Sequence, residues 1–537
     1  LMLEEYMLNF VKKPINIQSS GLVACGCALL LLACNLSFWQ QTTAVYPLNL
    51  ANSGFLVALC LLVGCVNYAL LSLFNFKYVL KPVLIFLLFI SAISAYAMDS
   101  YGYIISAQAF ENMLQTDRRE IYDLLTWKLF VYLGGIFIIP ACIILSCKIK
   151  YITARRLTLH LLITVMLIIT NLVVFSKNYT SFLRNHKQIR YYLNPIRPVY
   201  SGIKYASMHL RASSDVSFKI LDPAPALLPH TGKPRLIVLV VGEADRAANQ
   251  YLNGYSRQTN PLLSARNDIY NFTNFYSCGT ETSVSVPCMF SAYTREEFTY
   301  AKGRYTENLV DILHKSRIQV LWRDNDSGCK NVCDRIAVDD FNDAKITPYC
   351  NDFECLDEVL FHELDKFIDG GIGDKLIVLH KKGNHGPAYF KRYPEKFAVF
   401  QPSCQSNELQ DCTIEQIVNA YDNVVLYTDY FLNKVITDLE KHADKYQAAM
   451  IYVSDHGESL GENGIYLHAM PYWLAPKEQI HIPFVFWASK DFAVDREHLT
   501  ATQHRPLSHD FLFHSVLGLF KVKTTAYQEK FDLFIKK

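Results

Sequence analysis

Five long apolar stretches in the first third of the chain constrain its fold more than any other feature. Each is close to the ~20 residues that a helix needs to cross the hydrocarbon core of a bilayer. The first is too long, and too poorly followed by a small-residue cleavage site, for a signal peptide. The sequence therefore predicts five transmembrane helices rather than helices buried in a water-soluble core. The stretches are residues 21–40, 53–74, 79–98, 127–147 and 157–176.

Basic residues in the short loops predict the orientation of these helices, because Lys and Arg concentrate on the cytoplasmic side. They occur before the first stretch, between the second and third, and between the fourth and fifth. The loop at 41–52 has no Lys or Arg, and the loop at 99–125 has more acidic than basic residues. We therefore expect a cytoplasmic N-terminus and, after five spans, a C-terminal part outside the cytoplasm.

The cysteines of the C-terminal part provide an independent indication of that compartment. They are eight in number and fall into four close pairs, which in an oxidising compartment indicates disulfides. A zinc ribbon is the alternative, but the spacings at 329–333 and 350–355 are not those of zinc knuckles. The expected pairs are Cys278–Cys288, Cys329–Cys333, Cys350–Cys355 and Cys404–Cys412.

After a connector or interfacial segment at 178–230, short β-rich runs alternate with helical patterns. Continuous apolar strands that alternate with helices predict an α/β/α sandwich with a mostly parallel sheet. We expect a transmembrane domain at 1–177 and a soluble domain at 231–537. The net charge of +2 gives no reason to expect a nucleic-acid partner. The expected strands are 235–243, 318–324, 375–380, 448–456 and 482–487, with helices at 307–317 and 417–442.

Acidic and histidine residues occur where these strands end. The ligand site of such a sheet lies beyond the carboxyl ends of its strands, and carboxylates with imidazoles suit Zn²⁺ or Mn²⁺. The sequence therefore predicts a metal site, although spacing does not separate ligands from the residues behind them. The residues concerned are Glu243, His380, His385, Asp455, His456 and His468.

The segment SCGTETSVSVPCM (277–289) can reach the same edge of the sheet. A hydroxyl beside a divalent cation is deprotonated more readily, and a helix that starts within TETSVS would favour a phosphate at its N-terminus. The pattern does not choose among its hydroxyls. They are Ser277, Thr280, Thr282, Ser283 and Ser285.

Four motifs together resemble the lipid A phosphoethanolamine transferases, which include the mobile colistin-resistance proteins. They are VVGEADRAANQYLNGYSRQTNP, SCGTETSVSVPCMFS, HKKGNHGPAYFKRYP and VSDHGESLGENGIYLHAMPY. The resemblance implies an alkaline phosphatase/sulfatase-like fold and a Zn²⁺ cofactor. The segment VVGEADR has Asp245 and Arg246 where relatives often have Thr-Ala-Arg, so Asp245 adds a negative charge near the expected metal.

The implied roles are nucleophile for Thr280 and zinc ligands for Glu243, Thr280, Asp455 and His456. His385 and His468 match histidines that lie behind the zinc ligands or bind a second zinc, and that contact the phosphate or the leaving group. Lys330 matches a lysine that binds the phosphoethanolamine group.

Asn112, Thr116 and Glu120 recur every four residues in ENMLQTDRRE, so they share a helix face. The resemblance implies that they hold the ethanolamine of the substrate. The alternative is a solvated helix face with a capping residue.

The resemblance also implies a reaction. A monomeric enzyme of the Gram-negative inner membrane, with its catalytic domain in the periplasm, moves phosphoethanolamine from phosphatidylethanolamine to a lipid A phosphate. The path is ping-pong through a phosphothreonine-type intermediate, releases diacylglycerol, and gives polymyxin resistance. The alternatives are transfer of phosphoethanolamine or phosphoglycerol to another glycan or glycolipid, a phosphatase or sulfatase, and an inactive scaffold. CGTETS lacks the CxPxR-type motif of sulfatases.

Overall fold

The computed structural model describes residues 15–115, 118–186, 188–213, 217–230, 232–342, 344–351 and 354–535. The chain forms two compact units, Leu1–Ala107 with Leu125–Lys204 and Gln108–Leu124 with Tyr205–Lys537. This division differs from the expected domains in two places. The first unit continues to Lys204, and residues 108–124, expected in an outer loop of the membrane domain, belong to the second unit.

The first unit holds the apolar helices. Four helices among the described residues are long and apolar enough to cross a membrane, and a fifth span results if one bent pair counts as a single span. The expected helical transmembrane region is therefore confirmed, with four or five spans. The four are α4 (Leu50–Ser72), α5 (Leu80–Tyr101), the run Trp127–Ser146 formed by α8 (Trp127–Tyr132), η1 (Leu133–Ile138) and α9 (Ile139–Ser146), and α10 (Ala154–Val174).

The first expected span is not one helix. It consists of α2 (Ser19–Ala33) and α3 (Leu36–Val45), which meet at an angle of 57°. The Asn35 side-chain amide donates to a carbonyl in the last turn of α2 at 2.8 Å, and the Asn194 amide donates to the carbonyl of Cys34 at 3.1 Å. Backbone groups freed by a break at membrane depth need such partners, so two buried asparagines permit an interruption that the apolar pattern did not show.

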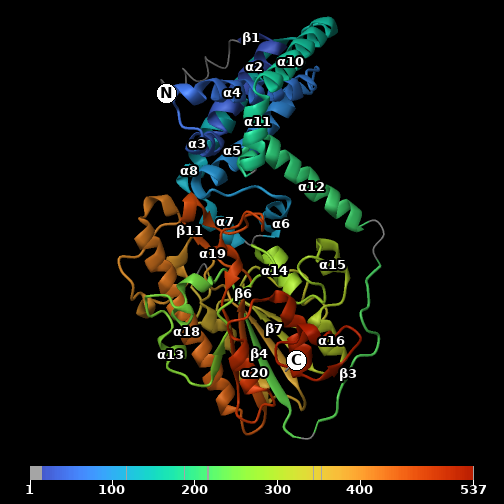
Figure 1. Ribbon diagram of the computed structural model, residues 1–537, viewed down its shortest axis with the longest axis vertical. Helices are drawn as coiled ribbons and strands as arrows, with labels where there is room; N and C mark the ends of the chain where they lie inside the picture. The colour runs from blue at the N-terminus through green and yellow to red at the C-terminus, as the bar shows by residue number, and fades with distance from the viewer. Residues whose placement is uncertain are drawn as a thin grey trace. The chain divides into compact units, whose positions relative to one another are not determined.

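A seven-stranded sheet forms the centre of the second unit (Figure 1). All five expected strands are present, and only β14 runs antiparallel to its neighbours β10 and β5. The expected mostly parallel sheet is therefore confirmed. In spatial order the strands are β5 (Ile269–Asn271), β14 (Phe484–Ala488), β10 (Gln447–Ser454), β4 (Arg235–Gly242), β9 (Lys375–His380), β7 (Gln319–Asp324) and β8 (Ala337–Asp340).

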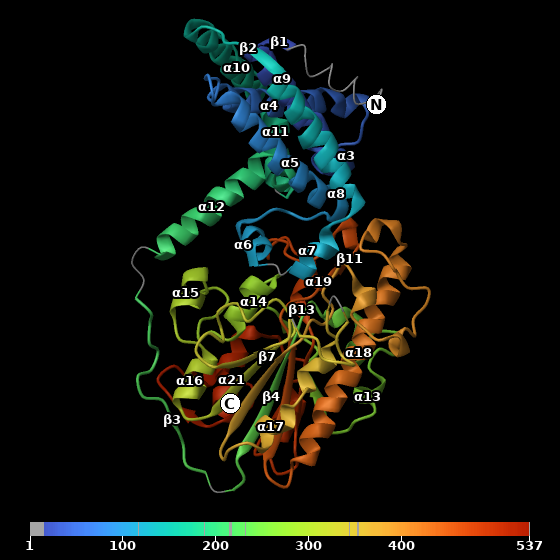
Figure 2. The same cartoon turned by 180° about the vertical axis from the view of Figure 1, so that it is seen from behind.

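Helices cover both faces of this sheet (Figure 2). One buried apolar cluster joins it to α16 (Leu309–Lys315) and α21 (Leu512–Leu519), and the other joins it to α17 (Leu364–Asp369) and α18 (Ile414–Lys441). Both expected helices begin at a capping box, with Asn308 before α16 and Thr413 before α18. Such a box satisfies backbone N–H groups that have no partner inside the helix. The α/β/α sandwich is thus confirmed.

Short elements carry the expected site segments to the carboxyl edge of the sheet. Strand β6 (Phe275–Tyr276) leads into SCGTETS, and the hairpin of β11 (Ser459–Leu460) and β12 (Tyr466–Leu467) leads to His468. The four expected cysteine pairs are all joined by disulfides, which close short loops in this unit. They are Cys278–Cys288, Cys329–Cys333, Cys350–Cys355 and Cys404–Cys412.

Candidate active site

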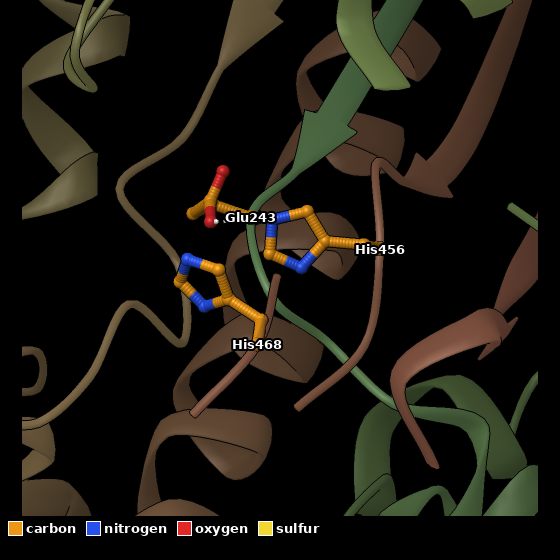
Figure 3. A group of neighbouring side chains, drawn as sticks. All are labelled: Glu243, His456 and His468. Atoms are coloured by element: carbon orange, nitrogen blue, oxygen red, sulfur yellow. Dashed lines mark ion pairs between the residues drawn. The ribbon is translucent and has the colours of Figure 1, made fainter. Parts of the chain in front are cut away.

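Glu243, His456 and His468 form a buried group at the ends of the central strands. One possible ligand atom from each lies within 4.8 Å of the others. Glu243 follows β4, His456 follows β10, and His468 follows the β11–β12 hairpin. Figure 3 shows the carboxylate and the two imidazole rings close together, with an ion pair of 3.3 Å between Glu243 Oε1 and His456 Nε2.

The hydrogen bonds that His456 and His468 make through Nδ1 leave Nε2 of each ring available to bind a cation. His456 Nδ1 lies 2.9 Å from the carbonyl of Gly457, and His468 Nδ1 lies 3.3 Å from Glu458 Oε1. Donation from Nδ1 to an oxygen keeps the lone pair on Nε2, the arrangement found behind metal-bound histidines.

Two carboxylate oxygens at the site are buried without a hydrogen bond. Within the described part of the chain, neither Glu243 Oε1 nor Asp455 Oδ2 has a hydrogen-bond partner. Asp455 Oδ2 lies 3.3 Å from His456 Nε2. Because buried polar atoms are rarely left unsatisfied, two carboxylates and an imidazole nitrogen in this arrangement fit a Zn²⁺ ion.

The charges at the site also favour a cation. Burial alone lowers the pKa of His456, but Asp455 and Glu243 outweigh burial and raise that pKa to about 10. Burial raises the pKa of Asp455 well above its ordinary range, and the neighbouring Glu243 carboxylate raises it further. A site that stabilises a proton on a buried imidazole to this extent is one that attracts positive charge.

The structure distinguishes between the hydroxyls of SCGTETS. Thr280 Oγ1 donates to the carbonyl of Met470 at 2.7 Å, next to the loop that carries His468. Thr282 Oγ1 donates to Glu243 Oε2 at 3.0 Å and lies 3.5 Å from His456 Nε2. The expected ligands Glu243, Asp455 and His456 thus meet, while Thr280 is hydrogen-bonded to a backbone carbonyl and Thr282 contacts the group. No spacing in the sequence could have distinguished Thr282.

Helix α14 (Thr282–Met289) begins inside TETSVS, where the sequence predicted a helix start. The Cys278–Cys288 disulfide links the turn before this helix to its last residues. Gly279 packs so closely that a Cβ there would approach Ser285 Oγ to 2.8 Å. The CGT turn therefore requires glycine, and it places Thr280 just before the N-terminus of α14, where N–H groups favour an anion.

His385 lies beside His468, whereas Lys330 lies near α14. The His385 ring is centred 5.6 Å from that of His468. Lys330 Nζ donates to the carbonyl and the hydroxyl of Ser327, each at 2.8 Å. Lys330 also lines a small pocket together with Glu111 and Ser283. Lys330 is therefore near α14, and the described contacts do not join it to Glu243 or His456.

The expected ethanolamine-binding face is described only in part. Asn112 lies half-buried in α6 (Ala107–Gln115). Thr116 and the side chain of Glu120 lie outside the described residues. Glu111, which the sequence did not single out, is 4% exposed.

A buried ion-pair network that the sequence did not indicate connects α7 (Arg118–Leu124) to the HGPAYFKR segment. Asp123 Oδ2 lies 2.7 Å from Arg392 Nη2, and Arg392 also pairs with Glu354. Arg392 Nε donates to the carbonyl of His385 at 3.0 Å. This network places α7 in the second unit and fixes the backbone that carries His385.

The carboxylate of Asp245 is buried and hydrogen-bonded to residues outside the metal-binding group. It accepts hydrogen bonds from Tyr452 at 2.5 Å and from Gln250 at 2.8 and 2.9 Å. Burial raises its pKa to about 6. The negative charge that Asp245 adds to this segment is therefore held by Tyr452 and Gln250.

Comparisons with known proteins extend the likeness over nearly the whole chain. The sulfatase family model matches residues 235–522, and the phosphoethanolamine transferase EptA/EptB model matches residues 63–210. The chain is 40% identical to phosphatidylethanolamine transferase Mcr-1 of Escherichia coli over 525 residues, 95% of this chain and 96% of that one. It is 38% identical to phosphoethanolamine transferase EptA of Escherichia coli (strain K12) over 514 residues, 93% of each chain.

A solved full-length structure is also similar. The integral membrane protein lipooligosaccharide phosphoethanolamine transferase A from Neisseria meningitidis superposes with a TM-score of 0.93 at 35% identity, covering 97% of this chain and 99% of that one. The likeness therefore includes the membrane helices as well as the soluble part.

Proposed function

Because this chain belongs to the EptA/EptB family of phosphoethanolamine transferases, we propose that it transfers phosphoethanolamine from phosphatidylethanolamine to a phosphate of lipid A. The observation that carries this proposal is the convergence of buried Glu243, Asp455 and His456 beside the CGT turn. The enzyme acts as a monomer in the Gram-negative inner membrane, with its N-terminus in the cytoplasm and its second unit in the periplasm. Both substrates are membrane lipids, which explains why the enzyme has apolar helices that anchor it in the membrane.

Glu243, Asp455, His456 and Thr280 are the residues that would hold a zinc ion. Bound there, zinc would favour the alkoxide of the threonine and stabilise charge on the phosphoryl oxygens. In this structure the Thr280 hydroxyl donates to Met470, so it must turn away from that carbonyl to act. Thr282 keeps Glu243 oriented through its 3.0 Å hydrogen bond.

The transfer has two balanced steps. Thr280 Oγ gives its proton to His385 or His468 and bonds to the phosphorus of the donor, and the bond from phosphorus to the glycerol oxygen breaks. Diacylglycerol leaves as an alcohol, taking a proton from His385 or His468. A lipid A phosphate gives its proton to the same histidine, its oxygen bonds to the same phosphorus, and the bond from phosphorus to Thr280 Oγ breaks as the histidine returns a proton to Thr280. A covalent phosphothreonine-type ester separates the two halves, as ping-pong transfer requires.

The residues around Thr280 bind the head group. The N-terminus of α14 and Lys330 favour the phosphate, and Asn112, Thr116 and Glu120 hold the ethanolamine. Adding an amine to a lipid A phosphate reduces negative surface charge, so the product cell resists polymyxin and other cationic peptides.

Mass spectrometry of the trapped ester tests the nucleophile. We expect the full chain, after exposure to phosphatidylethanolamine, to carry one phosphoethanolamine on the peptide that contains Thr280. Thr282→Ala should still form this ester, more slowly because Glu243 loses a hydrogen bond, and Thr280→Ala should form none. An ester that persists in Thr280→Ala, or that maps to Thr282, would contradict the assignment.

Analysis of the acceptor tests the substrate. Cells that express the chain should contain lipid A heavier by one phosphoethanolamine group, and cells that express Thr280→Ala should not. Unmodified lipid A together with a modified glycan would instead support a transferase acting on another acceptor.

A further inference from the structure

The segment that follows the last membrane helix, α10, is rich in positive charge. Residues 175–204 contain six Lys and Arg residues, and residues 125–204 contain no Asp or Glu. Basic residues of short loops concentrate on the cytoplasmic side of a membrane protein, yet on the proposed topology this segment lies on the periplasmic side. Membrane orientation therefore does not account for its charge.

Contacts within the first unit place this segment near the end of a membrane helix. The Tyr192 hydroxyl donates to the carbonyl of Gly102 at 3.2 Å, and Gly102 caps the C-terminus of α5. The Ser201 hydroxyl donates to the carbonyl of Ile105 at 2.8 Å. Because α5 is long and apolar enough to cross the bilayer, a segment held at its end lies close to the lipid head groups.

Two arginines of the segment contact the same tyrosine ring. The guanidinium carbons of Arg197 and Arg190 lie 4.3 and 5.2 Å from the centroid of the Tyr191 ring. Arg190 Nη2 also donates to the Tyr191 hydroxyl at 3.4 Å, and Arg197 lies 5.4 Å from the centroid of the Tyr200 ring. Stacking on a ring restrains a guanidinium while most of its N–H groups stay available to a ligand.

Neither arginine forms an ion pair with a carboxylate among the described residues. Arg197 is half-buried, and its Nε is a buried nitrogen without a hydrogen-bond partner in the part of the chain that the structure describes. Burial lowers the pKa of Arg197, and the like charge of Arg190 adds to the decrease. A bound anion would offset both effects and satisfy the buried N–H group.

We propose that Arg190 and Arg197 bind the phosphate of an anionic membrane lipid head group. Guanidiniums recognise phosphate oxygens through paired N–H···O hydrogen bonds. The ligand is a lipid because the site lies at the end of α5, and because Tyr191 and Tyr200 carry the amphipathic rings that are enriched at membrane interfaces. The site uses neither Thr280 nor the metal-binding group, so it rests on the proposed membrane topology but not on the transfer reaction.

Native mass spectrometry of the full chain in detergent tests this site. The delipidated chain is titrated with phosphatidylglycerol, and separately with phosphatidylcholine, whose head group is zwitterionic. Wild type should bind one phosphatidylglycerol at least about 10-fold more tightly than Arg190→Gln/Arg197→Gln, because hydrogen bonds between charged groups are lost. Phosphatidylcholine should bind equally to both.

Two further variants distinguish a defined site from diffuse positive charge. Arg190→Lys/Arg197→Lys keeps both charges but loses the planar guanidinium, so it should also bind phosphatidylglycerol about 10-fold more weakly. The control Lys177→Gln/Arg184→Gln removes two exposed charges of the same segment and should bind like wild type. Circular dichroism and melting curves check that each variant folds, and Tyr191→Leu, which removes the shared ring but no charge, replaces an arginine variant that does not.

Wild-type affinity in Arg190→Lys/Arg197→Lys, or an equal loss in Lys177→Gln/Arg184→Gln, would overturn the site. Displacement of phosphatidylglycerol by millimolar inorganic phosphate would overturn the lipid as its ligand. The trapped threonine ester reports on the transfer reaction and the lipid titration reports on this site, so either proposal can fail while the other holds.

Discussion

Removing the carboxylate of Asp123 should weaken the attachment of α7 to the rest of the second unit. Asp123 is 7% exposed by side chain and pairs with Arg392, which is 2% exposed, at 2.7 Å. It also pairs with Lys391 at 2.5 Å, where the lysine is 38% exposed. The substitution Asp123→Ala removes both pairs and leaves Arg392 with Glu354 as its carboxylate partner among the described ion pairs.

The cost follows from the burial of each pair. Removing the only partner of a buried charge costs about 3–5 kcal/mol, but Glu354 continues to neutralise Arg392. A hydrogen bond between charged groups contributes about 1.5–3 kcal/mol, and the more exposed pair with Lys391 adds little. We therefore expect the free energy of opening α7 to fall by about 2 kcal/mol, which is about 30-fold in its opening equilibrium.

Hydrogen exchange of the full chain measures this opening directly. Amides of α7 and of the segment around Arg392 should exchange about 30-fold faster in Asp123→Ala than in wild type at neutral pH. The control is Asp369→Ala, which breaks an exposed pair with Lys445 of similar length, 2.8 Å, with side chains 49% and 65% exposed. Exchange in the control should stay at the wild-type rate.

The pH dependence gives the reasoning a second check. Burial alone raises the pKa of Asp123, but Arg392 and Lys391 outweigh burial and hold that pKa below its ordinary value. A folded-state pKa below the unfolded value stabilises the fold above ~3.9, and the stabilisation is lost as pH falls through the folded pKa. The difference between wild type and Asp123→Ala should therefore vanish in acid. Equal exchange at neutral pH, or a difference that persists in acid, would refute the argument.

Three further predictions concern the packing around the site and the membrane unit. Replacing Cys278 and Cys288 by Ala should lower stability by about 2–3 kcal/mol, because the disulfide closes a short loop, and thermal melting measures the loss. Asp245→Asn should leave the metal content unchanged. Burial raises the pKa of Asp245 to about 6. The protonated carboxyl therefore stabilises the fold below pH ~3.9, the unfolded-state pKa, and this stabilisation is lost as the pH rises to about 6. Wild-type stability relative to this variant should fall by about 3 kcal/mol over the interval, as melting at each pH should show. Asn194→Ala removes the donor to the Cys34 carbonyl. The free energy of unfolding of the membrane unit, measured in SDS, should fall by about 2 kcal/mol.

The architecture was largely predictable because its signals are local. Runs of about 20 apolar residues indicate membrane helices, and apolar strands alternating with helices indicate a covered parallel sheet. The central strands appear where expected, and the four disulfides join residues no more than 10 positions apart. The family expected from four motifs is also confirmed.

The break after α2 and the position of α7 were not predictable in this way. Asn35 and Asn194, which are 159 positions apart, satisfy backbone groups at the break, and Asp123 pairs with Arg392 across 269 positions. No periodicity reports contacts at such separations.

The sequence by itself determined which residue types stand at the ends of the central strands and which segment carries the hydroxyls. Only the tertiary structure decided that Thr282 contacts Glu243 while Thr280 donates to Met470, and that Asp326 and His380 each bring a possible ligand atom within 4.8 Å of one from Glu243. The physical reason is that ligand geometry depends on side chains from separate strands meeting within a few ångströms. Strand pattern places those side chains on one edge of the sheet, but the packing of the strands and loops determines which of them come within contact distance.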